Sequence, residues 1–179
     1  MKAIAEIGLS KSIKFFFATI FDLLFSIMIF PPLRVLLLRV VGAKIGKNVV
    51  IHSIRFINLY RGSFRNLTIG DNCFLGGEVL LDLADKISLK NHVTLAERVN
   101  VLTHVNVGYH DHPLQKYFPA FTKPTKFENG VFAGVNSTIL AGVQLKEGVF
   151  VAAGSVVTES VDPMMLVGGV PAKIIRKLN

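Results

Sequence analysis

Three of the five histidines in the chain fall within nine positions, at His104, His110 and His112 of the stretch HVNVGYHDHPL. An imidazole serves near neutral pH as a general base, and it is also a common ligand of zinc. A loop that is rich in histidine without either role is the third reading. Spacing alone does not separate these readings, so the choice depends on the elements that hold the stretch.

A six-residue period begins at Phe127 and runs through the hexads FENGVF, AGVNST, ILAGVQ, LKEGVF, VAAGSV and VTESVD. A period of six is typical neither of a helix nor of simple strand alternation. It predicts a mainly β solenoid in which each hexad forms one side of a triangular coil, with parallel sheets around an apolar interior. The first positions are Phe127, Ala133, Ile139, Leu145, Val151 and Val157, and the small or β-branched fifth positions are Val131, Ser137, Val143, Val149, Ser155 and Val161.

The same period is present less cleanly over residues 45–101. It slips by two residues after Leu81, and Arg55 and Arg61 break the rule at the fifth position. We therefore expect one irregular coil in this part of the solenoid. Glycines such as Gly134 are expected to supply the backbone freedom that the corners need.

The last regular hexad before a gap covers residues 101–106 and contains His104, and the hexads resume at Phe127. An excursion over about residues 107–125 must therefore leave the solenoid. Loops of this length that lack their own structure are usually functional or disordered. The histidine-rich stretch lies at the start of this excursion.

Residues 1–40 form a hydrophobic and basic segment, which we expect to be helical. Its most apolar run covers residues 15–30, with Asp22 near the middle, and the pair Pro31-Pro32 follows. A membrane span needs about 20 apolar residues. We therefore expect helices that lie in the membrane interface. Packing on the domain or on a neighbouring subunit, and a short span, are the alternatives.

The overall charge points to an acidic partner. The formal net charge is +8 and half of the residues (51%) are hydrophobic, which favours an anionic membrane surface or a polyphosphate ligand. Nucleic acid is disfavoured, because the chain has no Trp, only three Tyr and no basic stretch interleaved with aromatics. The single cysteine, Cys73, excludes an internal disulfide.

The stretch GVNSTILAGVQLKEGVFVAAGSVVTESVDPMMLVGGVPAKIIRKL closely resembles the hexapeptide-repeat acyltransferases. The resemblance covers residues 41–179, including a basic tail over 163–179, and is most specific in GGVPAKIIRK. Within that family the chain is most similar to sugar O-acetyltransferases and to enzymes that acetylate surface polysaccharides. The resemblance implies a left-handed parallel β-helix, acetyl-CoA as co-substrate and a homotrimer. No metal is expected.

The resemblance also assigns roles to the histidine-rich stretch. In the sugar acetyltransferases the catalytic histidine precedes a proline where the loop leaves the helix, and His112-Pro113 matches this position. His112 is therefore the first candidate for the general base and His104 the second. Asp111 is a candidate for orienting a ring or binding a sugar hydroxyl, and His110 for contacting the substrate.

Binding of CoA is expected at the coil edge between two subunits, with the phosphates near the C-terminal tail. Lys173 and Arg176 match the basic pair that meets the phosphates in the family. Glu159 departs from the lysine usual there, and a carboxylate would repel phosphate. The further positions carried over from the family are Phe132, Gly134, Gly142, Ala153 and Thr158.

These observations predict an acetyl-CoA-dependent O-acetyltransferase acting on a sugar hydroxyl. The apolar N-terminal segment favours a glycolipid or envelope polysaccharide precursor as acceptor, and a cytoplasmic protein peripheral at the inner face of the membrane. Two other functions stay open. One is a zinc enzyme like the γ-class carbonic anhydrases, and the other is a non-catalytic trimeric scaffold.

Overall fold

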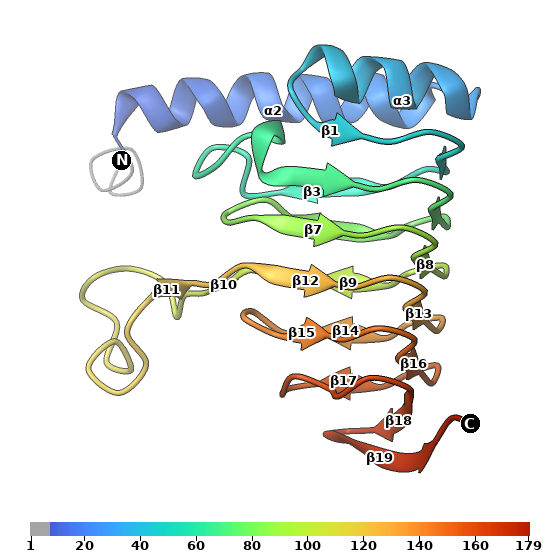
Figure 1. Cartoon of the computed structure of the whole chain (residues 1–179). Coiled ribbons are helices and arrows are strands. Elements are labelled where there is room, and N and C mark those ends of the chain that lie inside the picture. Colours follow the sequence, from blue (N-terminus) through green and yellow to red (C-terminus); the bar gives the residue numbers. More distant parts are fainter. Residues whose placement is uncertain (1–7) are drawn as a thin grey trace.

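The computed structural model describes residues 8–179 and arranges most of them as stacked triangular coils with three parallel sheets (Figure 1). Sheet A consists of β1 (Lys44–Ile45), β4 (Leu67–Ile69), β7 (Ile87–Leu89), β12 (Thr125–Phe127) and β15 (Gln144–Leu145). Sheet B consists of β2 (Val50–Ile51), β5 (Phe74–Leu75), β8 (Thr94–Leu95), β13 (Phe132–Ala133), β16 (Phe150–Val151), β18 (Met165–Gly169) and the antiparallel β19 (Ala172–Lys177). Sheet C consists of β3 (Arg55–Ile57), β6 (Leu80–Asp82), β9 (Asn100–Val101), β14 (Thr138–Ile139) and β17 (Val156–Val157). The predicted mainly β solenoid is confirmed.

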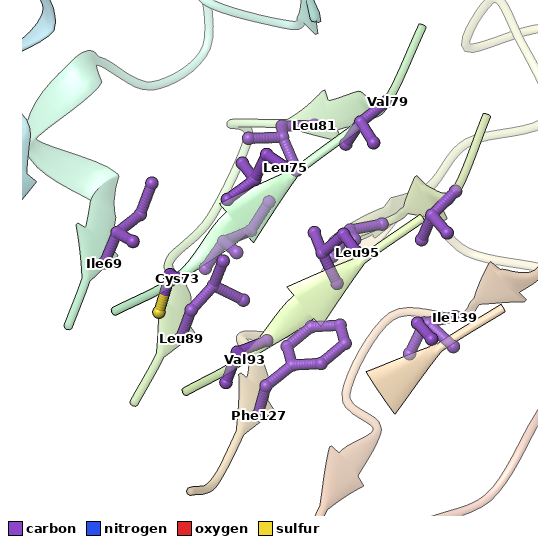
Figure 2. Packing of buried hydrophobic residues seen from close by; sticks show 14 of the residues in the cluster. Ile69, Cys73, Leu75, Val79, Leu81, Leu89, Val93, Leu95, Phe127 and Ile139 are labelled. Carbon is purple, nitrogen blue, oxygen red and sulfur yellow. The ribbon is translucent and has the colours of Figure 1, made fainter. Parts of the chain in front are cut away.

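Stacking of equivalent hexad positions builds the interior. Leu75 pairs with Leu95, and Leu81 pairs with Val101, one coil apart, and all four side chains are fully buried. Figure 2 shows Leu75, Leu81 and Leu95 pointing into the space between the sheets, with the ring of Phe127 among them. Burying one such side chain contributes about 1.5–3 kcal/mol. The repeated interior is therefore the main source of stability.

Two kinds of corner matter for the site. The B–C corners follow the strands of sheet B, and the C–A corners follow the strands of sheet C. At the B–C corner after β13, a Cβ on Gly134 would lie 2.7 Å from the backbone N of Ala153 in the next coil. Glycine is therefore required at this position by the close stacking of the coils. It is not required by the backbone conformation, because Gly134 does not have a positive φ. At the C–A corner after β14, Gly142 does have φ +87°.

Two helices cover the end of the solenoid at β1, β2 and β3 (Figure 1). α2 (Leu9–Ile27) places Phe25 against Phe56 of β3, with ring centroids 5.5 Å apart. α3 (Pro31–Val40) begins at the proline pair, where a missing N–H costs no helical hydrogen bond. Neither helix within residues 8–179 has the length and hydrophobicity of a membrane span. Residues 1–7 of the predicted 1–40 segment lie outside the described residues.

The coil predicted to be irregular lies directly under α2. Between β3 and β4 the chain forms a bend with a short 3-10 helix (Phe64–Asn66). This bend brings Phe64 to Phe21 of α2, with ring centroids 4.5 Å apart. The broken hexads therefore supply the surface on which the helix packs.

A hairpin leaves the solenoid at the C–A corner after β9. It consists of β10 (His104–Val105) and β11 (Phe121–Thr122), which pair antiparallel, and the chain between them protrudes from the coil stack (Figure 1). The backbone N–H of Lys123 donates to the carbonyl of Thr103 over 2.8 Å and closes the base of the hairpin. The coil then resumes at β12, which pairs with β7 as though no insertion intervened.

Candidate active site

His104 faces a buried carboxylate at the base of the hairpin. Its Nδ1 lies 2.5 Å from Oδ2 of Asp82, the last residue of β6. The His104 side chain is 21% exposed, whereas that of Asp82 is fully buried. The solenoid brings the two together because β6 and β9 are neighbours in sheet C, and both residues lie at its C–A edge.

Asp82 is held on several sides. Its Oδ2 accepts from the backbone N–H of Thr103 (2.9 Å), and its Oδ1 accepts from the Asn58 amide (2.9 Å) and the backbone N–H of Ala84 (3.2 Å). Burial alone would raise the pKa of the Asp82 carboxyl, but the hydrogen bonds from His104, Thr103, Asn58 and Ala84 outweigh it and lower that pKa. Asp82 is therefore an ionised, fixed acceptor at neutral pH.

The ionised Asp82 selects one tautomer of the His104 ring. A carboxylate can only accept, so Nδ1 carries the proton and donates it to Asp82. The lone pair of the neutral ring is then on Nε2. This is the arrangement of a histidine general base with an orienting carboxylate.

Acid is expected to remove a stabilising contribution that comes from Asp82. The pKa of this group is lower in the folded chain than in the unfolded chain, where it is about 3.9. Its contribution is therefore fully present above about pH 4 and is lost as the pH falls toward the lower, folded-state value. Urea unfolding measured at steps from about pH 6 to pH 3 will show this loss.

Asp82→Asn should flatten that part of the pH dependence. The matched control is Asp162→Asn, because the Asp162 side chain is 70% exposed and pairs with Lys146 at the surface. We expect the control to keep the slope of the native chain. An Asp82→Asn protein with an unchanged slope would contradict the assignment.

His112 lies in different surroundings. It is exposed in the hairpin loop, and its Nδ1 accepts from the backbone N–H of Leu114 over 3.2 Å. His110 and Asp111 are exposed beside it, and the three residues line an open depression over residues 110–117. The hairpin places this depression away from the coil corner where His104 lies (Figure 1).

The positions carried over for CoA fall into two groups at opposite edges of sheet C. The first lies on sheet B and its B–C corners: the ring of Phe132 stacks on Phe150 at 4.6 Å. The second lies at the C–A corners, on the side of His104. The first group comprises Phe132, Gly134, Ala153, Lys173 and Arg176, and the second comprises Gly142 and Thr158.

The tail positions lie on the surface. Lys173 and Arg176 are exposed on β19, where they pair with Gly168 and Leu166 of β18. Glu159 is exposed immediately after Thr158, at the C–A corner. The carboxylate that departs from the family pattern is therefore on the opposite edge of sheet C from the basic pair.

The sequence reasoning missed Asp82 and Asn58. Both lie at C–A corners of earlier coils, so their distance in sequence from His104 hides the contact. One signal was present, because the two-residue slip in the period follows Leu81 and begins with Asp82. This interruption of the repeat is the signal by which Asp82 could have been singled out.

The histidines of the stretch are not gathered into a metal site. Within residues 8–179, no three His, Cys, Asp or Glu side chains are grouped so that they could hold a metal ion. Cys73 is buried in the interior, and burial raises the pKa of its thiol. Among the three histidines of the stretch, His104 is the one for which a contact with a carboxylate is described, through Asp82.

Comparison with known proteins defines the class first. A solved hexapeptide-repeat acetyltransferase from Vibrio cholerae, in complex with acetyl coenzyme A, is 27% identical with a TM-score of 0.77, over 90% of this chain and 85% of that one. The family model for the hexapeptide repeat of succinyl-transferase matches residues 66–80 and 124–159. The fold is thus the left-handed parallel β-helix of this class of transferases, as the resemblance implied.

Curated relatives define the family. The protein named "Putative colanic acid biosynthesis acetyltransferase WcaF" of Escherichia coli is 31% identical over 145 residues, which are 80% of this chain and 74% of that protein. Galactoside O-acetyltransferase of Escherichia coli is 26% identical over 147 residues, 80% of this chain and 68% of that protein. The chain belongs to the hexapeptide-repeat acyltransferase family.

Proposed function

We propose that this protein transfers the acetyl group of acetyl-CoA to a sugar hydroxyl, with His104 as the general base. The observation that carries the proposal is the contact between His104 and the buried carboxylate of Asp82 at the C–A corner. The site lies where the hairpin leaves the coil, which gives an acceptor access from solvent. His112, the first candidate from the sequence, lacks such a carboxylate contact among the hydrogen bonds described for it.

The reaction needs no covalent bond to the protein. Nε2 of His104 takes the proton of the sugar hydroxyl as its oxygen attacks the thioester carbonyl. Asp82 stabilises the positive charge that the ring then carries. The C–S bond breaks when the tetrahedral intermediate collapses, and the imidazolium returns the proton to the CoA sulfur. The products are an O-acetyl sugar and free CoA thiol, and His104 is neutral again.

We further propose that CoA binds between subunits of a homotrimer. In one chain, the Phe132 group and the Gly142–Thr158 group lie at opposite edges of sheet C. A neighbouring solenoid packed along this sheet would bring the basic tail of one copy toward the His104 corner of another. The exposed ammonium and guanidinium of Lys173 and Arg176 suit the CoA phosphates. The acetyl-CoA held by the Vibrio cholerae relative supports this co-substrate.

The proposed acceptor is a saccharide of a glycolipid or an envelope polysaccharide precursor. The names of two relatives, which refer to colanic acid biosynthesis and to galactosides, support an acceptor of this chemical class. The exposed apolar helices support contact with a membrane surface, and we propose that this is the cytoplasmic face. An acceptor anchored in lipid would then be close to the site.

The test is release of CoA thiol from acetyl-CoA in the presence of a panel of soluble sugars and glycolipid extracts. We expect release that depends on the acceptor, with a product heavier by one acetyl group in mass spectrometry. Light scattering should give the mass of three chains. Binding of CoA without transfer to any acceptor would favour the scaffold, and hydration of CO2 with bound zinc would favour the carbonic anhydrase alternative.

A further inference from the structure

The outer face of the two N-terminal helices carries many exposed apolar side chains. The inner side of α2 packs Ala18, Phe21 and Phe25 toward the first coil. The opposite side, one half-turn away at helical spacing, is exposed. We call the exposed set the apolar plate: Leu9, Ile13, Phe16, Ile20, Leu23, Leu24 and Ile27 of α2, Ile29 and Phe30 of the connection, and Leu33, Leu36 and Val40 of α3.

The apolar plate lies at one end of the solenoid and faces away from the coils. α3 buries Arg34, Val35 and Leu38 against β1 and β2, so its plate residues also point outward. Both helices run across the stack of coils, at its end (Figure 1). A helix that is apolar on both sides needs a cover on its outer side, and exposed apolar patches of this extent mark interaction surfaces.

The distribution of charge indicates which kind of partner binds the apolar plate. Residues 8–68, which form the two helices and the first coil, hold nine Lys and Arg against the single acid Asp22, a balance of +8. Residues 69–179 hold ten basic and ten acidic residues, a balance of zero. The exposed basic side chains of this part of the chain are Lys11 and Lys14 of α2, Arg39 of α3, and Lys44, Lys47, Arg55, Arg61 and Arg65 of the first coil. At helical spacing, Lys11 and Lys14 lie on the side of α2 opposite to the plate, so their long side chains flank it.

We propose that the apolar plate and these basic residues dock the protein on an anionic lipid bilayer. The apolar side chains enter the boundary of the acyl chains, and the Lys and Arg side chains reach lipid phosphates around them. A second copy is a poorer occupant, because two such ends face to face would bring two balances of +8 together. The solenoid then extends away from the bilayer, and the His104 corner lies on the lateral surface of the solenoid.

The inference deepens the proposed membrane location, and it is tested apart from catalysis. The full chain is sedimented with vesicles of phosphatidylcholine alone, or with about one third phosphatidylglycerol. We expect binding to be at least about tenfold stronger with the anionic lipid. Raising the salt from about 0.05 M to 0.5 M should weaken it, because charges at a surface are screened. Equal binding to both vesicles, or none, would overturn the proposal.

Variants locate the surface. Phe16→Glu combined with Leu23→Glu replaces plate side chains that are 61% and 65% exposed, and should lower vesicle binding by at least about tenfold. The control is Val170→Glu, an apolar residue that is 71% exposed and lies in the turn between β18 and β19. We expect this control to bind vesicles as the native chain does.

Two further measurements separate a failure of membrane docking from a failure of catalysis. Thermal unfolding and acetyl transfer to a soluble sugar should be unchanged in the double variant, because the plate lies outside the site. A double variant that keeps vesicle binding would place the docking surface elsewhere. A double variant that changes the number of copies in light scattering would make the plate a contact between chains. Lost transfer to soluble acceptors in every protein, with vesicle binding intact, would count against the proposed chemistry alone.

Discussion

Replacing His104 by alanine is expected to lower kcat for acetyl transfer by about 10²–10⁴-fold, which is the usual contribution of a general base. The KM for acetyl-CoA should change little, because the ring acts on the acceptor hydroxyl. The measurement is acceptor-dependent thiol release at saturating acetyl-CoA, with thermal unfolding as the check on folding. The physical reason is the Nε2 lone pair that Asp82 fixes.

His112→Ala is the matched control for this result. Its ring is exposed and bonded to the backbone of its own loop, so we expect a loss below about tenfold, through acceptor contacts alone. The reverse pattern, with activity kept in His104→Ala and lost in His112→Ala, would move the base into the hairpin loop.

Asp82→Asn is expected to cause nearly as large a loss, up to the same range of about 10²–10⁴-fold in kcat. An amide in place of the carboxylate removes the charge that stabilises the protonated ring and frees the ring to adopt the other tautomer. Because Asp82 acts through His104, the double variant should be no slower than His104→Ala alone. A double-mutant cycle on kcat measures this coupling.

Asn58→Gly is the control for the Asp82 cluster. Asn58 has φ +60°, which glycine adopts readily, so the change removes the amide and keeps the backbone. One of the hydrogen bonds to Asp82 is then lost, and we expect a loss in kcat below about tenfold. Losses that add in the Asp82–His104 double variant would instead assign Asp82 a purely structural role.

The solenoid was predictable because every coil needs apolar residues at the same interior positions of its hexads. An interior position such as Leu145 or Val151 must be apolar in each turn, so the pattern is present many times in the chain. The C–A and B–C corners were harder to interpret. Gly134 was expected to provide backbone freedom, but the structure requires it because the next coil is only 2.7 Å from its missing Cβ. That contact is between two different coils, so the residues next to Gly134 in the sequence do not indicate it.

The candidate site was predictable only in part, for a related reason. His104 could be singled out from its place before the excursion, whereas its partner Asp82 lies 22 residues earlier. The two meet only because β6 and β9 are adjacent in sheet C. The preference for His112 came from a family motif, which carries no information on which ring faces a buried carboxylate. The CoA positions stay a prediction, since they divide between two edges of one chain.

The hairpin is attached to the solenoid by its two ends, and the coil hydrogen bonds pass beneath it. Lys123 bonds to Thr103 across its base, and the hydroxyl of Thr125 donates to the carbonyl of Leu102 over 2.7 Å. A segment anchored in this way can be lengthened, shortened or exchanged while the ladder from β7 to β12 stays intact. Doubling the length of such a loop costs only about 0.6 kcal/mol. The hairpin is therefore free to diversify in length and sequence, while the corner that holds His104 and Asp82 stays fixed.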